Sequence, residues 1–314
     1  MIKCWVIGSG GLLGSALGRA LLGRGVDLFT QTERFQWGNE QELESQLSAA
    51  VESFAQQAAA ADMWQIYWAA GVGTLGSAAA DLAVETKAMV CLLRLLEAQP
   101  QLAMTPGVIA LASSAGAIFA GSADETITSM TPPAPTTAYA YEKLRQEDLL
   151  RSYVASNSNV TALSARISTL YGPGHSAGKK QGLIAHIARC VLRNEPVRIF
   201  VPFDTVRDYI FSDDVAARMI SASFVAVNKP GLSIKIIASE QPASIAEIIY
   251  TFKRIARRAP RIVTSVCPDT AFYSRRIQFH SDIGEAGDRP RTSLLVGISQ
   301  VLAAERTAYV RGRS

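Results

Sequence analysis

Residues 2–14 read IKCWVIGSGGLLG, a short apolar run that breaks into a glycine-rich turn. Gly8, Gly11 and Gly14 stand three residues apart, and apolar residues at helical spacing follow them as far as Leu21. This order predicts a buried strand, a tight turn and the N-terminus of a helix. The backbone N–H groups of such a turn and the positive end of the helix dipole favour a phosphate. The stretch therefore predicts a dinucleotide site in an α/β fold.

The composition narrows the class of protein. The chain has 314 residues, of which 48% are hydrophobic and 18% charged, and a net charge of only +4, so we expect a globular protein without a nucleic-acid surface. Four cysteines without C-x-x-C spacing indicate free thiols in a reducing compartment, and three histidines without ligand spacing argue against a metal. The early glycine turn and the lack of a long apolar run favour a cytoplasmic location without a membrane partner.

Strand and helix patterns alternate along the first half of the chain. We expect strands at 26–30, 35–37, 64–69, 108–112 and 160–167, and helices at 40–61, 82–98 and 138–156. This alternation predicts a doubly wound parallel sheet of the Rossmann type, with ligands at the carboxyl ends of the strands. The segments 8–14, 70–71 and 113–114 all follow strands, so we expect them to converge.

From Tyr171 onward, proline and glycine punctuate shorter elements. This change predicts a second, smaller α/β domain that binds the substrate. We assign 1–170 plus 207–238 to an NAD(P)-binding Rossmann domain, and 171–206 plus 239–314 to the substrate domain.

Tyr139 and Lys143 lie four residues apart in the expected helix 138–156, so they share one face. A nearby ammonium favours the phenolate form of tyrosine and brings its pKa, normally about 10, toward the working pH. Lysine is also long enough to hold ribose hydroxyls, and a serine such as Ser114 can orient the substrate oxygen. We therefore predict that Ser114, Tyr139 and Lys143 are catalytic.

Six stretches in this order carry a family resemblance: GSGGLLG (8–14), AAG (69–71), SSAGAIF (113–119), YAYEK (139–143), RISTLYGPG (166–174) and VRDYIFSDDV (206–215). The chain resembles the extended branch of the short-chain dehydrogenase/reductase superfamily, the NAD(P)-dependent epimerase/dehydratase family. The resemblance implies the same catalytic set, with Ser113 as an alternative to Ser114. It also implies cofactor contacts from Gly8, Ser9, Gly10, Gly11, Leu12, Leu13, Gly14, Ala69, Ala70, Gly71 and Lys143.

Three departures from the family pattern refine this expectation. Gly116 and Ala117 stand where 4,6-dehydratases of the family have an Asp-Glu pair, so we do not expect a dehydratase. Thr169 replaces an asparagine that often touches the nucleotide diphosphate. The helix expected at 82–98 also lacks the asparagine usual near its start, so the support of the site differs.

The cofactor is expected to be NADP or NAD. The register of the second strand puts Thr32 where an NAD-binding aspartate would stand, followed by Glu33 and Arg34. A hydroxyl and an arginine suit the 2′-phosphate of NADP, whereas a slip of one residue would place an acid there. The pattern favours NADP.

The substrate is a small molecule, and the resemblance favours a nucleotide sugar that is epimerised or reduced. It implies that Thr169, Arg207 and either Arg275 or Arg276 bind the substrate, with Arg276 selected here, while Arg207 could instead pair with a nearby aspartate. The alternatives are an NADPH-dependent reductase of a non-nucleotide carbonyl compound and a non-catalytic NAD(P)-binding regulatory protein. By analogy, the helices at 82–98 and 138–156 could form a homodimer.

Overall fold

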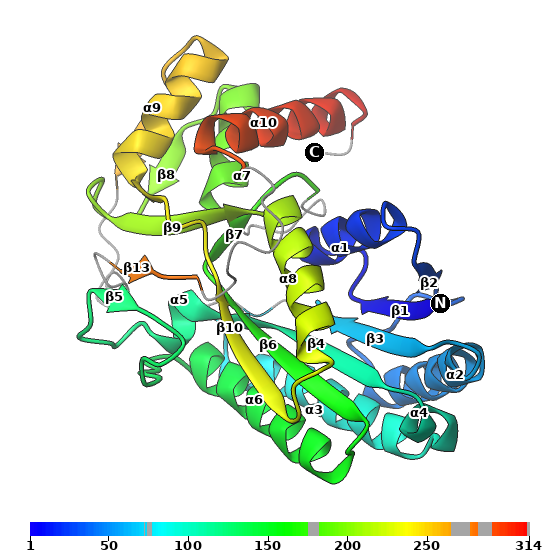
Figure 1. The fold of residues 1–314 in the computed structure, drawn as a ribbon. Helices are drawn as coiled ribbons and strands as arrows, with labels where there is room; N and C mark the ends of the chain where they lie inside the picture. The colour runs from blue at the N-terminus through cyan, green and yellow to red at the C-terminus, as the bar shows by residue number, and fades with distance from the viewer. Residues whose placement is uncertain (72, 74–76, 175–181, 265–276, 282–290, 313–314) are drawn as a thin grey trace.

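The computed structural model describes residues 1–71, 73, 77–174, 182–264, 277–281 and 291–312. Six parallel strands form its main sheet (Figure 1). In spatial order they are β10 (Leu232–Ile237), β6 (Val160–Ile167), β4 (Gly107–Ser114), β3 (Met63–Trp68), β1 (Ile2–Ile7) and β2 (Asp27–Phe29). Central parallel strands are buried on both faces, which is why they read as nearly continuous apolar runs. The sheet confirms the predicted Rossmann-type architecture.

Helices cover both faces of this sheet (Figure 1). One face carries α2 (Glu40–Ala58), α3 (Ala79–Glu97), α4 (Pro100–Met104) and α6 (Ala138–Ser156), and the other carries α1 (Leu12–Leu22) and α8 (Ser212–Ala226). Trp5, Phe54 and Trp64 fill the first interface. Each fully buried large apolar side chain stabilises the fold by about 1.5–3 kcal/mol.

The smaller region builds its own core. Its strands are β7 (Thr169–Tyr171), β9 (Val206–Phe211) and β11 (Pro242–Ser244) in one sheet, and β8 (Val197–Ile199) beside β12 (Ile262–Thr264). Three helices, α7 (Leu183–Arg193), α9 (Ile245–Ala256) and α10 (Leu294–Val310), pack together there (Figure 1). The chain returns to the main sheet through α8 and β10, whereas β9 stays in the smaller sheet. The proposed domain boundaries stay a prediction.

Three short elements pack together beside the carboxyl end of β4. Helix α5 (Ala115–Ile118) follows β4 directly, and β5 (Thr126–Ile127) pairs with β13 (Gln278–Phe279). Their side chains share a small apolar cluster that includes Phe119.

The strand expected at 35–37 is wrong. The side chain of Gln46 accepts a hydrogen bond from the Gln36 N–H at 2.8 Å, and the Asn39 N–H donates to the Gln36 carbonyl at 3.0 Å, so the backbone turns instead. Asn39 then caps α2, which ends at Ala58 rather than at 61. The aromatic residues that suggested a strand pack sideways: the rings of Trp37 and Trp68 meet edge to face with centroids 6.2 Å apart. Aromatic burial, not strand pairing, explains the pattern.

Among the described residues, no helix combines the length and the apolar character needed to cross a bilayer. The cytoplasmic location stays a prediction.

Candidate active site

The glycine turn joins β1 to α1, and close packing requires two of its glycines. Gly8 has φ +89°, and a Cβ atom there would lie 2.6 Å from the Ala70 nitrogen. A Cβ atom on Gly14 would lie 2.1 Å from the Gly8 carbonyl oxygen. The Gly11 N–H closes the turn by donating to that same oxygen at 2.9 Å. Side chains at Gly8 or Gly14 would therefore displace the backbone itself.

The same turn suits a phosphate. Gly11 caps α1 without a side-chain acceptor, and the first turn of α1 holds no acidic residue. Space is open beside Gly10, where a Cβ atom would meet nothing within 4 Å. Ser9 is exposed, whereas the Leu13 side chain is buried, so Leu13 could contact a cofactor only through its backbone. Uncapped helix N–H groups with a positive dipole end fit a pyrophosphate.

Gly14→Ala should weaken NAD(P) binding by about 5- to 150-fold, because the turn must open to relieve the contact with the Gly8 carbonyl, and overpacking of this kind costs about 1–3 kcal/mol. Gly18→Ala, further along α1, is the matched control, since its methyl group enters open space away from the turn. Fluorescence titration with NADH and NADPH measures both variants. Equal affinities for Gly14→Ala and the unmodified protein would contradict the assignment of this turn.

The chain after β3 connects the glycine turn to the predicted catalytic residues. The Ala69 N–H donates to the Ile7 carbonyl at 2.9 Å, and Ala70 packs on Gly8. Gly71 has φ +148°, and a Cβ atom on Gly73 would lie 3.2 Å from Cδ2 of Tyr139. The predicted segment 69–71 thus lies between the turn and Tyr139.

Ser114 and Tyr139 meet at the carboxyl end of β4. Ser114 caps α5 by accepting from the Ala117 N–H at 3.4 Å, and its side chain hydrogen-bonds Tyr139. Burial raises the pKa of Tyr139 above its usual range, the negative charge of Glu85 raises it further, and the Ser114 hydrogen bond lowers it. The pKa of Tyr139 is thus raised where the sequence predicted a lowered one, and burial is the largest cause.

Ser113 has a different role. Its hydroxyl donates to Oε1 of Glu147 at 2.7 Å and is buried. Glu147 also binds Arg166, with 2.7 Å between its Oε2 and an arginine nitrogen. Ser113 therefore stabilises a buried ion pair while Ser114 faces Tyr139, which supports Ser114 as the catalytic serine.

Lys143 is buried beside Tyr139. Its side chain is only 6% exposed, with Nζ 5.7 Å from the centre of the Tyr139 ring. Nζ donates to Oε1 of Gln146 at 3.0 Å and lies 3.9 Å from a carboxylate oxygen of Glu85. Burial lowers the pKa of Lys143, whereas the charges of Glu85 and Glu147 raise it.

Glu85 and Gln146 escaped the sequence reasoning. The asparagine that the family usually has near the start of α3 is missing. Its absence was the one sequence signal that another side chain supports the site. Gln146 lies one turn after Lys143 on α6, whereas Glu85 lies on α3, so the packing of α3 against α6 brings Glu85 to Lys143.

The predicted specificity residues of the cofactor lie on the chain that follows β2. Thr32, Glu33 and Arg34 are all exposed there. The preceding residue, Gln31, turns inward and accepts from the indole N–H of Trp5 at 3.4 Å. Both the hydroxyl–arginine pair and the acid are therefore accessible to a ribose.

Two predicted substrate residues share the smaller sheet. Thr169 pairs with Tyr209 across β7 and β9, and Arg207 lies two residues before Tyr209. Alternate residues of a strand point to the same face, so Arg207 and Thr169 share one face. An Arg207 nitrogen donates to the Val206 carbonyl at 2.9 Å. Arg275 and Arg276 lie outside the described residues.

Asp204, Asp213 and Asp214 are the aspartates that could pair with Arg207 instead of a phosphate. Asp213 pairs with Arg19 at 2.6 Å, and Asp214 accepts from the backbone and hydroxyl of Thr292, whereas Asp204 is exposed. The phosphate role of Arg207 stays a prediction.

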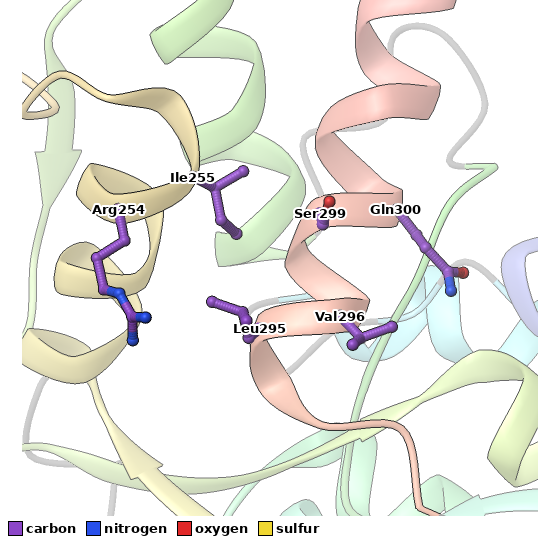
Figure 2. Close-up of a pocket in the computed structure, with 6 residues that line it drawn as sticks. All are labelled: Arg254, Ile255, Leu295, Val296, Ser299 and Gln300. Carbon is purple, nitrogen blue, oxygen red and sulfur yellow. The ribbon is translucent and has the colours of Figure 1, made fainter.

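A surface pocket lies between α9 and α10 (Figure 2). It is lined by Arg254, Ile255, Leu295, Val296, Ser299 and Gln300. None of these is a predicted site residue, so the pocket is separate from the predicted catalytic residues.

Comparisons with known proteins agree with this geometry. Residues 4–229 match the model of the NAD dependent epimerase/dehydratase family. The chain is similar to dTDP-L-rhamnose 4-epimerase of Burkholderia thailandensis, with 32% identity over 38% of this chain and 32% of the relative. It is also similar to dTDP-4-dehydro-6-deoxyglucose reductase of Escherichia coli, with 32% identity over 37% of this chain and 36% of the relative. The matched segment thus spans about a third of each curated relative.

Solved structures share the fold over nearly the whole chain. UDP-glucose 4-epimerase of Thermus thermophilus, in complex with NAD, superposes with a TM-score of 0.77 at 20% identity, covering 98% of this chain and 100% of that one. RMD of Pseudomonas aeruginosa, complexed with NADPH, gives a TM-score of 0.76 at 20% identity, with 97% and 99% covered. The fold, the family match over most of the chain and the ordered motifs lead to one conclusion: the chain belongs to the NAD dependent epimerase/dehydratase family, whose members are NAD(P)-dependent enzymes of the extended short-chain dehydrogenase type.

Proposed function

We propose that the protein exchanges a hydride with NAD(P) at a hydroxyl or keto carbon of a nucleotide sugar, as an epimerase or a keto-reductase. The observation that carries this proposal is the meeting of Ser114, Tyr139 and Lys143 beside a glycine turn shaped for a pyrophosphate.

In this mechanism NAD(P) supplies or accepts the hydride. In the direction of reduction, Tyr139 donates its phenolic proton to the substrate oxygen while the carbon gains the hydride. The raised pKa of Tyr139 favours the protonated phenol, which is the form that reduction requires. Ser114 orients the substrate oxygen through its hydroxyl. Lys143 holds the ribose hydroxyls of the cofactor and places a positive charge beside Tyr139. Oxidation reverses each transfer.

The proposal of a nucleotide sugar rests on the relatives and on Arg207. Both curated relatives are named for dTDP-linked sugars, and the half-buried guanidinium of Arg207 on β9 would suit a diphosphate. Gly116 and Ala117 lack the acidic groups for eliminating water, so we do not propose a 4,6-dehydratase.

Thermal-shift screening with UDP-, GDP-, dTDP- and CDP-sugars, in the presence of NADP or NAD, tests this substrate class. A stabilisation by one nucleotide series supports it. Thr169, in place of asparagine, favours the second candidate, an NADPH-dependent reductase of a non-nucleotide carbonyl compound. Cofactor binding without any shift from nucleotide sugars would select that candidate.

For the cofactor we propose a preference for NADP, based on the exposed Thr32 and Arg34. Arg34→Ala should weaken NADPH binding about tenfold or more, since a hydrogen bond to a charged group contributes about 1.5–3 kcal/mol, and should leave NADH binding nearly unchanged. Arg24 is another exposed arginine and lies before β2, so Arg24→Ala is the control and should change neither affinity. Paired fluorescence titrations measure the ratio, and an equal loss for both cofactors contradicts the preference.

We also propose a homodimer through α3 and α6. Val84 and Val90 on α3 and Tyr141 on α6 are exposed, which suits an apolar helix contact. Sedimentation velocity decides between monomer and dimer.

A further inference from the structure

Glu85 joins three segments of the site. One oxygen of its carboxylate accepts from the Gly73 N–H at 2.7 Å, and the other lies 3.9 Å from Nζ of Lys143. The side chain is only 12% exposed. The carboxylate therefore connects the chain after β3, helix α3 and helix α6.

Two glycines make room for this carboxylate. A Cβ atom on Gly71 would lie 3.0 Å from Oε2 of Glu85, and one on Gly73 would lie 3.3 Å from Oε1. The same added atom on Gly73 would lie 3.2 Å from the Tyr139 ring. Gly73 is thus held between Glu85 and Tyr139, and its position depends on both.

The other charges around Lys143 are largely compensated. Glu147 on α6 is bonded by Arg166 of β6 through both of its oxygens. Glu142 on α6 accepts from the Thr86 hydroxyl at 2.6 Å and pairs with Arg145 at 3.7 Å. Glu85 forms an ion pair with Lys143, and of the two carboxylates that raise the pKa of Lys143, Glu85 and Glu147, its effect is the larger.

We propose that Glu85 is a positioning residue of the active site, whose carboxylate anchors the Gly73 backbone and keeps Lys143 charged and in place for the cofactor ribose. This inference rests on the proposed function, because it concerns the same cofactor site. Glu85 would support the site in place of the asparagine that the family usually has in this helix. It does so with a charged carboxylate instead of a neutral amide.

The charge makes the role measurable. Burial alone would favour neutral Lys143, and the Glu85 carboxylate opposes this by raising the pKa of Lys143. The same carboxylate raises the pKa of Tyr139. Removing the Glu85 charge should therefore lower the pKa values of Lys143 and Tyr139. A property that needs protonated Lys143 should then be lost at a lower pH than in the unmodified protein.

The experiment is a titration of NADPH and NADH binding, followed by fluorescence, over a range of pH. Affinity should fall as the pH rises through the Lys143 pKa. In Glu85→Gln, which keeps the shape and an acceptor for the Gly73 N–H, we expect this midpoint to move down by about one to three pH units. Glu85→Asp keeps the charge and should keep the midpoint near its original pH, even if its affinity is lower. Asp81→Asn, on the exposed side of the same helix, should behave as the unmodified protein.

The outcomes separate this inference from the proposed function. An affinity loss in Glu85→Gln that is equal at every pH means that Glu85 only shapes the chain, which overturns the positioning role and leaves the proposed function intact. If the pH midpoint of cofactor affinity moves as far in Glu85→Asp as in Glu85→Gln, the positioning role of the Glu85 charge is also overturned. Failure of the unmodified protein to bind either cofactor at any pH overturns the proposed function together with the inference.

Discussion

Tyr139→Phe should lower turnover by about 10²–10⁴-fold, the usual contribution of a positioned acid or base. The substitution removes one hydroxyl and leaves the ring in place against Gly73. Binding of NADPH or NADH should stay within a few-fold, because the predicted cofactor contacts lie on the glycine turn and Lys143. Steady-state kinetics on the substrate from the nucleotide-sugar screen, with cofactor titration beside it, gives both quantities.

Tyr141→Phe is the matched control for this variant. Tyr141 lies two residues further along α6, its side chain is 60% exposed, and it should keep full activity. If Tyr139→Phe also kept full turnover, proton transfer by Tyr139 would be excluded. If turnover and cofactor affinity fell together, the hydroxyl would act in binding rather than in the reaction.

Local signals explain why much of the fold was predictable. The helix at 138–156 and the strand at 160–167 have the predicted bounds, because Thr137 caps the start of the helix, Asn157 follows its end, and the strand is a short run buried throughout its length. The glycine turn was predictable for a similar reason: only glycine tolerates φ +89° at Gly8 with Ala70 packed against it. Helix caps and glycine turns depend on residues that are close together in the chain, so a single sequence is enough to predict them.

The failures come from interactions between distant segments. Phe35 and Trp37 are residue types that are common in strands. Their rings instead pack in the core, Phe35 against Trp5 and Trp37 against Trp68. The sequence likewise left Ser113 and Ser114 open, because the choice depends on which serine faces Glu147 from α6. The pKa of Tyr139 also depends on burial and on Glu85 from another helix. The site residues stay predictions, now supported by these contacts.

Glu147→Ala should lower the free energy of unfolding by about 3–5 kcal/mol, the effect of leaving one partner of a buried ion pair alone. Glu147 is 1% exposed and accepts hydrogen bonds from Ser113, Ser164 and Arg166. The variant would leave the Arg166 guanidinium, also buried, without a counter-charge next to the Phe119 ring. Urea denaturation, with the change in midpoint multiplied by the common slope, measures the loss.

Asp148→Ala is the control one residue along the same helix. Asp148 is 69% exposed and pairs with Arg151 at the surface, so its loss should change stability by about 0.5 kcal/mol or less. A second test separates the charge from the packing. If the unpaired guanidinium causes the loss, replacing both partners by apolar residues, Glu147→Leu with Arg166→Met, should recover part of the stability that Glu147→Ala removes. A double variant that is less stable than the single one would instead assign the loss to the hydrogen bonds of Ser113 and Ser164.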